Sequence, residues 1–138
     1  MIKIGILGDI GSGKSFVAKQ FGYPVFNADD EVNKIYKKDK KCFIKIKNTI
    51  PKHITTFPIN KTEIVKSIVS DRKNLKKITK IIHPIIRSKM NIFINKNKKK
   101  KLIVLDVPLL LENKLNKKDF ILVFVDAEKK KIIKNLKK

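Results

Sequence analysis

The chain has 138 residues, of which 42% are hydrophobic, so it is long enough for one domain with a buried core. Its formal net charge is +22, and lysine carries nearly all of the excess because Arg72 and Arg87 are the only arginines. No apolar run approaches the roughly 18 residues of a membrane span, and the single cysteine, Cys42, excludes an internal disulfide. We therefore expect a cytoplasmic protein without a membrane partner.

The positive charge allows a second interpretation, in which the chain is a basic nucleic-acid-binding module. Proteins that recognise base edges depend on arginine, which is scarce in this chain. Lysine, isoleucine and asparagine are all abundant together, which indicates a biased composition more than a dedicated binding face. We therefore expect no specific nucleic-acid partner, and the sequence does not indicate an oligomeric state.

The first predicted elements are a strand, a glycine-rich loop and a helix. The apolar strand Ile2–Leu7 precedes Gly8–Ser15, which follows the pattern Gly-x-x-x-x-Gly-Lys-Ser, and a helix ends near Gly22. This pattern is the phosphate-binding loop of nucleoside-triphosphate enzymes, in which backbone N–H groups bind the phosphates. Lys14 would reach the β- and γ-phosphates, and the Ser15 hydroxyl would bind Mg²⁺. The alternative is an ordinary glycine turn.

A short second strand, Pro24–Phe26, is followed by the segment Asn27–Asp30. A right-handed parallel crossover would bring both strand ends to one edge of the sheet, beside the phosphate loop. A kinase needs a carboxylate there to orient the acceptor hydroxyl and take its proton. Asp29 is the best candidate by position. The alternative is that it caps a helix, a role that Asp30 could equally fill.

Residues 30–97 are predicted to be mostly helical. Four residues are candidate N-caps for two helices in this region: Asn60 or Thr62, and Ser70 or Asp71. Pro84 is expected to end the second of these helices at His83 and to begin another, because proline has no N–H for the helical hydrogen bond.

Two further apolar runs are predicted to be buried parallel strands. Leu102–Leu105 ends in Asp106, and Phe120–Val125 ends in Asp126, which is expected to cap a last helix. Ligands bind at the carboxyl ends of such strands, so Asp106 could hold Mg²⁺ through water, or it could be a strand-end turn residue. The alternation of strands and helices predicts an α/β fold with a mainly parallel sheet flanked by helices.

Four blocks in this order resemble the dephospho-coenzyme A kinase family: Gly8–Ser15, Val25–Asp29, Ile82–Pro84 and Val107–Asn113. The family has Asp-Ala-Asp at the second block, Leu/Ile-His-Pro at the third and Pro-Leu-Leu-x-Glu at the fourth. The resemblance implies a phosphotransferase of coenzyme A biosynthesis. It would phosphorylate the ribose 3′-hydroxyl of dephospho-coenzyme A with ATP and Mg²⁺. It also implies a P-loop kinase core with a helical substrate-binding insertion, which we place at residues 30–97. Another nucleoside- or nucleotide-type P-loop kinase remains the alternative.

The resemblance also implies roles for individual residues. The ATP-binding residues would be Gly8, Gly11, Ser12, Gly13, Lys14, Ser15 and Phe16. Lys14 would contact the transferred phosphoryl group, and Asp29 would be the base for the 3′-hydroxyl. His83, Leu109 and Glu112 would lie near the acceptor substrate. For His83, which stands between the apolar Ile82 and Pro84, a structural role is the alternative. Ser15 and Asp106 are the expected metal-binding residues.

The chain departs from the family pattern in three places. Asn27 stands where the family usually has its first aspartate, and Phe16 replaces the usual threonine. The sequence given ends at Lys138, whereas family members continue with an arginine-bearing lid, a last strand and the segment around the adenine. We therefore expect residues 1–138 to be a single kinase domain truncated at its C-terminus, with weak ATP binding and slow turnover. Lid arginines supply much of the charge neutralisation in phosphoryl transfer.

Overall fold

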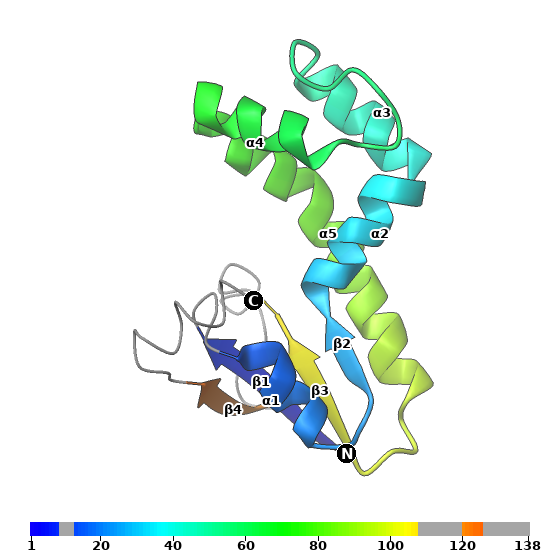
Figure 1. Ribbon diagram of the computed structural model, residues 1–138. Coiled ribbons are helices and arrows are strands. Elements are labelled where there is room, and N and C mark those ends of the chain that lie inside the picture. The colour runs from blue at the N-terminus through cyan, green and yellow to red at the C-terminus, as the bar shows by residue number, and fades with distance from the viewer. Residues whose placement is uncertain (9–12, 108–119, 126–138) are drawn as a thin grey trace. The chain divides into compact units, whose positions relative to one another are not determined.

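The computed structural model describes residues 1–8, 13–107 and 120–125 (Figure 1). The chain divides into two compact units. Met1–Asp29 and Met90–Lys138 form the first, which we call the sheet unit, and Asp30–Lys89 forms the second, the helical unit. Within the described ranges, no helix is both long enough and apolar enough to cross a membrane.

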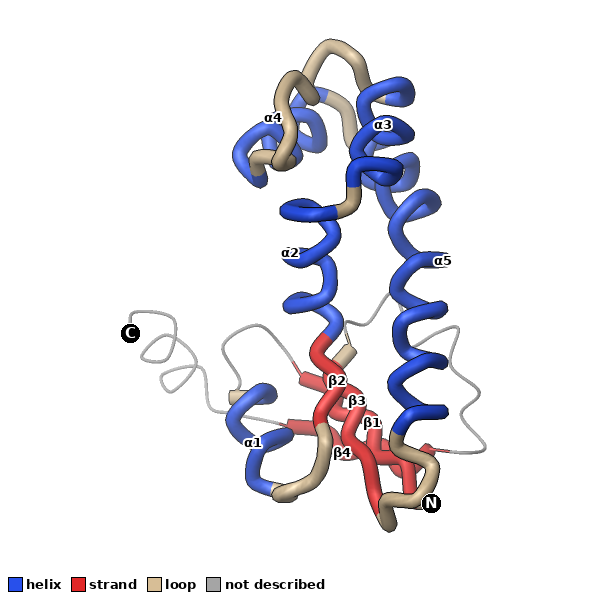
Figure 2. The backbone as a smooth tube through the Cα atoms, turned by 90° about the vertical axis from the view of Figure 1, so that its right-hand side faces the viewer, coloured by secondary structure: helices blue, strands red, loops and turns tan. Residues whose placement is uncertain are grey.

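The sheet unit contains four parallel strands in the order β2-β3-β1-β4 (Figure 2). The strands are β1 (Ile2–Gly8), β2 (Val25–Asn27), β3 (Leu102–Asp106) and β4 (Phe120–Val125). The prediction of an α/β fold with a parallel sheet is confirmed. The later strand β3 lies between β1 and β2, so the crossover from β1 to β2 skips one position in the sheet.

The helix α1 (Lys14–Gln20) lies against one face of this sheet (Figure 1). Ala18 of α1 is fully buried in one cluster with Ile4 and Ile6 of β1 and Val104 of β3. Burying an isoleucine side chain contributes about 1.5–3 kcal/mol, so this cluster fixes α1 on the sheet. The start of α1 is thereby held close to the ends of β1 and β3.

The register of the strands determines which residues meet at their carboxyl ends. Asp106 of β3 pairs with Ile6 of β1 on one side and with Asn27 of β2 on the other. Because all these strands are parallel, their carboxyl ends lie at the same edge of the sheet, where β1 leads into the glycine-rich loop. The last residues of β2 and β3 are therefore neighbours at the edge where ligands of parallel sheets bind.

Between β2 and β3 the chain forms four helices: α2 (Ala28–Lys38), α3 (Lys40–Thr49), α4 (Lys61–Ser70) and α5 (Lys73–Lys96). Two of the candidate N-caps are confirmed. The side chain of Asn60 accepts a hydrogen bond of 2.8 Å from the backbone N–H of Thr62 at the start of α4. The Asp71 carboxylate accepts one of 2.9 Å from the backbone N–H of Lys73 at the start of α5. Each bond satisfies a donor that the helix itself leaves unpaired.

The prediction that a helix ends at His83 was wrong, because α5 continues through Pro84 to its end at Lys96 (Figure 2). Proline inside a helix costs roughly 3 kcal/mol relative to alanine. Ile78, Ile82 and Ile86, which lie one turn apart on both sides of the proline, are all buried. Burial of this continuous apolar face offsets the cost of the missing hydrogen bond.

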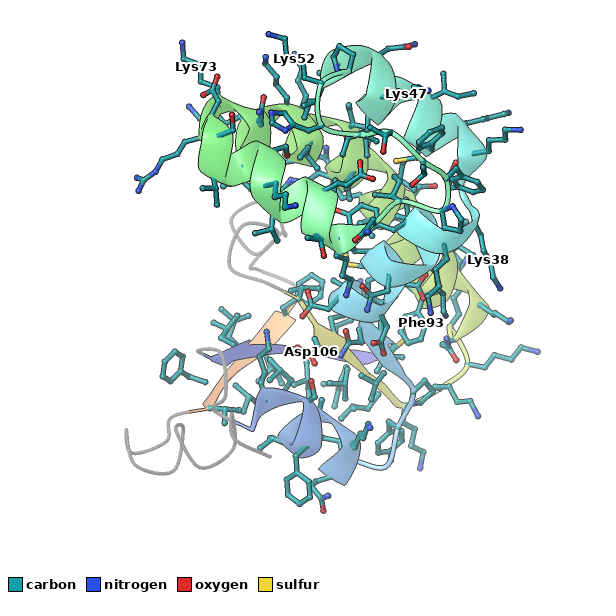
Figure 3. The ribbon with its side chains drawn as sticks, turned by 45° about the horizontal axis from the view of Figure 1, so that its top comes forward. Lys38, Lys47, Lys52, Lys73, Phe93 and Asp106 are labelled. Atoms are coloured by element: carbon teal, nitrogen blue, oxygen red, sulfur yellow. The ribbon has the colours of Figure 1, made fainter. Side chains whose placement is uncertain are left out.

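Lysine side chains cover the outer surface of the helical unit. Figure 3 labels Lys38, Lys47, Lys52 and Lys73, and all four are exposed and extend away from the helices. The high net charge is thus carried at least in part by solvated lysines on helix and loop surfaces.

Candidate active site

Asp106 is the residue at which the candidate site comes together. Its carboxylate lies at the end of β3, and the residue is only 4% exposed (Figure 3). The Lys14 ammonium is 3.2 Å from Asp106 Oδ1, and the Ser15 hydroxyl donates a 3.0 Å hydrogen bond to Asp106 Oδ2. Lys14 and Ser15, which the sequence assigned to phosphate and metal binding, therefore both contact Asp106, although Asp106 is distant from them in the chain.

Asn27 completes this cluster from the neighbouring strand. Its amide Nδ2 donates a 3.0 Å hydrogen bond to Asp106 Oδ2, the same oxygen that Ser15 contacts. Sequence reasoning treated Asn27 only as a missing carboxylate and did not assign it a role. The available signal was that Asn27 and Asp106 both end strands. The contact could not be predicted without knowing that β2 and β3 are adjacent.

A buried carboxylate is costly unless charges and hydrogen bonds compensate it. Asp106 has one ion pair and two hydrogen-bond donors, so both of its oxygens are satisfied in this arrangement. Lys14 also donates a longer hydrogen bond of 3.4 Å to the backbone carbonyl of Val107. The Lys14 side chain is thus held at the end of β3, with 19% of its surface exposed.

Gly13 shows why the loop needs glycine just before the helix. Its φ angle is 89°, in the left-handed region that side-chain-bearing residues rarely adopt, and it is the N-cap residue of α1. The backbone N–H of Val17 bonds to its carbonyl at 3.0 Å, so the first turn of α1 begins at this glycine. This conformation aims the following two residues, Lys14 and Ser15, at Asp106.

The other residues that we expect to bind ATP are Gly8, Gly11, Ser12 and Phe16. Gly8 is the last residue of β1, while Gly11 and Ser12 lie outside the described residues. Phe16 is 68% exposed on α1, so its side chain contributes little to the core. Their contacts with ATP stay predictions.

The chemistry of this cluster fits a magnesium ion bound together with phosphates. No group of three or more His, Cys, Asp or Glu side chains gathers within the described ranges, so these residues do not form an all-protein metal cage. Mg²⁺ needs no such cage, because it is commonly held by one or two protein oxygens, waters and substrate phosphates. The Ser15 hydroxyl uses its one hydrogen in the hydrogen bond to Asp106, which leaves the lone pairs of its oxygen free to face a cation.

Other expected site residues have known positions but untested roles. Asp29 is exposed in the first turn of α2, two residues after Asn27 in the sheet unit. His83 lies within α5 in the helical unit, where its side chain is half-buried. Leu109 and Glu112, with the turn that contains them, lie outside the described residues, as does Asp126.

Comparison with known proteins gives a consistent result. A family model described as dephospho-CoA kinase matches residues 2–138. Dephospho-CoA kinases from Wolbachia sp. subsp. Brugia malayi and from Bartonella quintana are each 36% identical to this chain. The matches cover 91% and 90% of the chain, and 67% and 66% of the relatives, respectively. The chain thus spans about two thirds of the length of these relatives.

A solved structure supports the same assignment at the level of the fold. The crystal structure of TT1252 from Thermus thermophilus superposes on this chain with a TM-score of 0.75 and 26% sequence identity. The match covers 98% of this chain and 70% of that one. The matched residues include the strands and α1 that bring Lys14, Ser15 and Asp106 together. The chain belongs to the dephospho-CoA kinase family, whose activity is the ATP-dependent phosphorylation of dephospho-CoA in coenzyme A biosynthesis.

Proposed function

We propose that this chain performs the family's reaction at the carboxyl edge of its sheet, on ATP bound with Mg²⁺ and on dephospho-CoA as acceptor. The observation that carries the proposal is the contact of Lys14 and Ser15 with the buried carboxylate of Asp106. In this account Lys14 and Ser15 bind the phosphates and the metal, Asp106 orients both, and Asp29 acts on the acceptor hydroxyl.

Ser15 and Asp106 are the residues that would hold Mg²⁺. When bound, the ion neutralises charge on the phosphate oxygens. Asp106 accepts a hydrogen bond from the Ser15 hydroxyl, so the Ser15 oxygen keeps its lone pairs directed away from the carboxylate. The Asp106 carboxylate would supply a negative charge for the ion, and its buried position would make that charge more effective than it would be in water.

Lys14 would exchange one anionic partner for another during binding. In the structure its ammonium pairs with Asp106, so neither charge is left uncompensated at the sheet edge. A phosphate oxygen could replace the carboxylate as the partner of Lys14, because ammonium–phosphate contacts are also strong charge-assisted hydrogen bonds. The long Lys14–Val107 bond of 3.4 Å adds little resistance to that exchange.

Asp29 is the proposed base for the ribose 3′-hydroxyl. Asp29 lies two residues after Asn27, the last residue of β2. Since Asn27 contacts Asp106, Asp29 is close in the chain to a residue that contacts the proposed metal-binding carboxylate. Asp29 is also exposed, as a residue that must contact an incoming substrate should be. His83, Leu109 and Glu112 are proposed to bind the acceptor, and a cytoplasmic location is part of the same proposal.

Calorimetric titration with ATP in the presence of Mg²⁺ tests the proposed binding residues. We expect Lys14→Ala to weaken ATP binding by at least roughly tenfold, since a charged hydrogen bond contributes about 1.5–3 kcal/mol. Lys19→Ala is the matched control, because Lys19 is an exposed lysine in the last turn of the same helix. Equal ATP affinities for Lys14→Ala and Lys19→Ala would contradict the proposal.

A further inference from the structure

Asn27 contacts the candidate metal-binding carboxylate from β2, the strand next to β3, whereas Lys14 and Ser15 contact it from α1. It is the register partner of Asp106 in the sheet, and its Nδ2 is 3.0 Å from Asp106 Oδ2. We propose that Asn27 is a positioning residue for magnesium-dependent ATP binding, because its amide holds Asp106 in the orientation that accepts the hydrogen bond from the Ser15 hydroxyl. This inference rests on the proposed function of Ser15 and Asp106.

The partners of Asp106 do not all have the same role. Lys14 and Ser15 belong to the segment assigned to the ligand, and Lys14 is expected to leave Asp106 when phosphates bind. Asn27 has no ligand assigned to it and ends β2, whose backbone is bonded to β3. Its hydrogen bond can therefore persist when the ion pair with Lys14 is replaced.

Ser15 and Asn27 share one oxygen of Asp106. Asp106 Oδ2 accepts both the Ser15 hydroxyl and the Asn27 amide, each at 3.0 Å. Without the amide, the carboxylate would lose a donor that restricts its rotation, and Oδ2 would be aimed less well at Ser15. The Ser15 hydroxyl would then be free to rotate, and its oxygen lone pairs would no longer be held in the direction of the cation. Partners that orient metal ligands typically affect metal affinity by 10- to 100-fold.

The side chain at position 27 is a hydrogen-bond donor. Asparagine stands where the family pattern has an aspartate, and its amide, unlike an ionised carboxylate, donates a hydrogen bond to Asp106. A second carboxylate 3.0 Å from Asp106 would repel it unless a proton or a cation lay between them. This chain therefore has a donor, in place of a charge, beside its candidate metal-binding carboxylate.

The test compares ATP affinity with Mg²⁺ and with EDTA, and it uses the ratio of the two dissociation constants as the magnesium-dependent gain. The variants are Asn27→Ala and Asn27→Leu, of which the leucine has a similar volume but no donor. We expect each to lower the gain roughly tenfold while the affinity in EDTA stays unchanged. Asn95→Ala, an exposed asparagine of the same unit, should leave both affinities unchanged.

A double variant separates positioning from a general structural effect. If Asn27 acts through Ser15, Ser15→Ala alone removes the gain, and adding Asn27→Ala lowers it no further. Equal weakening of both affinities, an unchanged gain, or additive losses in the double variant would each overturn the inference. If the unaltered chain shows no magnesium-dependent gain, the proposed function of Ser15 and Asp106 fails, and this inference fails with it.

Discussion

The Lys14 ammonium lies 3.2 Å from Oδ1 of Asp106, a carboxylate that ends β3 and is 4% exposed. The ion pair connects the start of α1 to the centre of the sheet. It therefore stabilises the fold of the sheet unit as well as bringing together two groups that we assign to ATP binding.

Replacing either member of this pair should destabilise the sheet unit. We expect Lys14→Met to lower the free energy of unfolding by about 1–3 kcal/mol. That is less than the 3–5 kcal/mol typical of breaking a buried ion pair, because Ser15 and Asn27 still donate to Asp106. Urea denaturation of Lys14→Met, Asp106→Asn and the double variant measures the coupling. The double variant should lose less stability than the sum of the single losses, and strict additivity would show that the pair contributes nothing.

Asp29→Asn keeps the size of the side chain but removes the proposed base. We expect turnover with dephospho-CoA to fall by roughly 10²- to 10⁴-fold, the usual range for a general base, while ATP affinity changes little. Asp30→Asn is the matched control, since it changes the adjacent acidic residue of the same helix. Near-normal turnover of Asp29→Asn, or a comparable loss of turnover in Asp30→Asn alone, would show that the base is not Asp29.

The Cys42 thiol should be unreactive in the folded chain. The residue is 1% exposed, and burial, with a smaller contribution from the Asp39 carboxylate, raises the pKa of its thiol from 9.0 to about 11. At pH 8 only about 0.1% of such a thiol is ionised, so a thiol reagent should react slowly until the chain unfolds. Rapid modification of the native chain at pH 8 would show that Cys42 is accessible.

The same pKa predicts a loss of stability in alkaline solution. Below pH 9 the thiol is protonated in both states, so its contribution to folding is fully present. Between pH 9 and pH 11 the unfolded chain releases the proton and the folded chain largely does not, so the free energy of unfolding should fall by roughly 1 kcal/mol per pH unit. Cys42→Ala should show a shallower decline over this range, and parallel declines would exclude the thiol as the cause.

Pro84→Ala should stabilise the helical unit, because Pro84 is an exposed residue inside α5. Alanine restores a backbone donor and is a better helix former by roughly 3 kcal/mol, partly offset by the greater freedom of the unfolded chain. We expect a net gain of about 1–2 kcal/mol in urea denaturation. Pro51→Ala, at an exposed turn position, should give no such gain. If Pro84→Ala is destabilising, the proline contributes contacts that its exposure does not indicate.

The strands were predictable because their apolar runs are bounded by glycine, charge or turn residues. The phosphate loop was predictable because its spacing is specific, and the left-handed Gly13 accounts for one of its glycines. Asn60 and Asp71 were predictable caps because their side chains can bond a backbone N–H two residues later. In these cases the determining interactions lie within a few residues of one another.

The errors and omissions came from interactions between distant residues. The helix through Pro84 was missed because a local rule for proline outweighed the apolar spacing of Ile78, Ile82 and Ile86 on both sides. The contact of Asn27 with Asp106 was missed because it depends on the order of the strands, which a local pattern does not specify. The sequence alone did not distinguish a metal ligand from a strand-end turn residue at Asp106. Its burial among Lys14, Ser15 and Asn27 favours a role in the site.

The measurement that tests the account most directly is ADP release from ATP by this chain, with dephospho-CoA or other adenylate-type nucleotides as the acceptor. We predict release that requires dephospho-CoA and Mg²⁺, is lost in Lys14→Ala and persists in Lys19→Ala. Formation of coenzyme A in the same reactions, followed by mass spectrometry, would identify the product. Release that occurs equally well with adenylate-type acceptors and does not respond to dephospho-CoA would contradict the account.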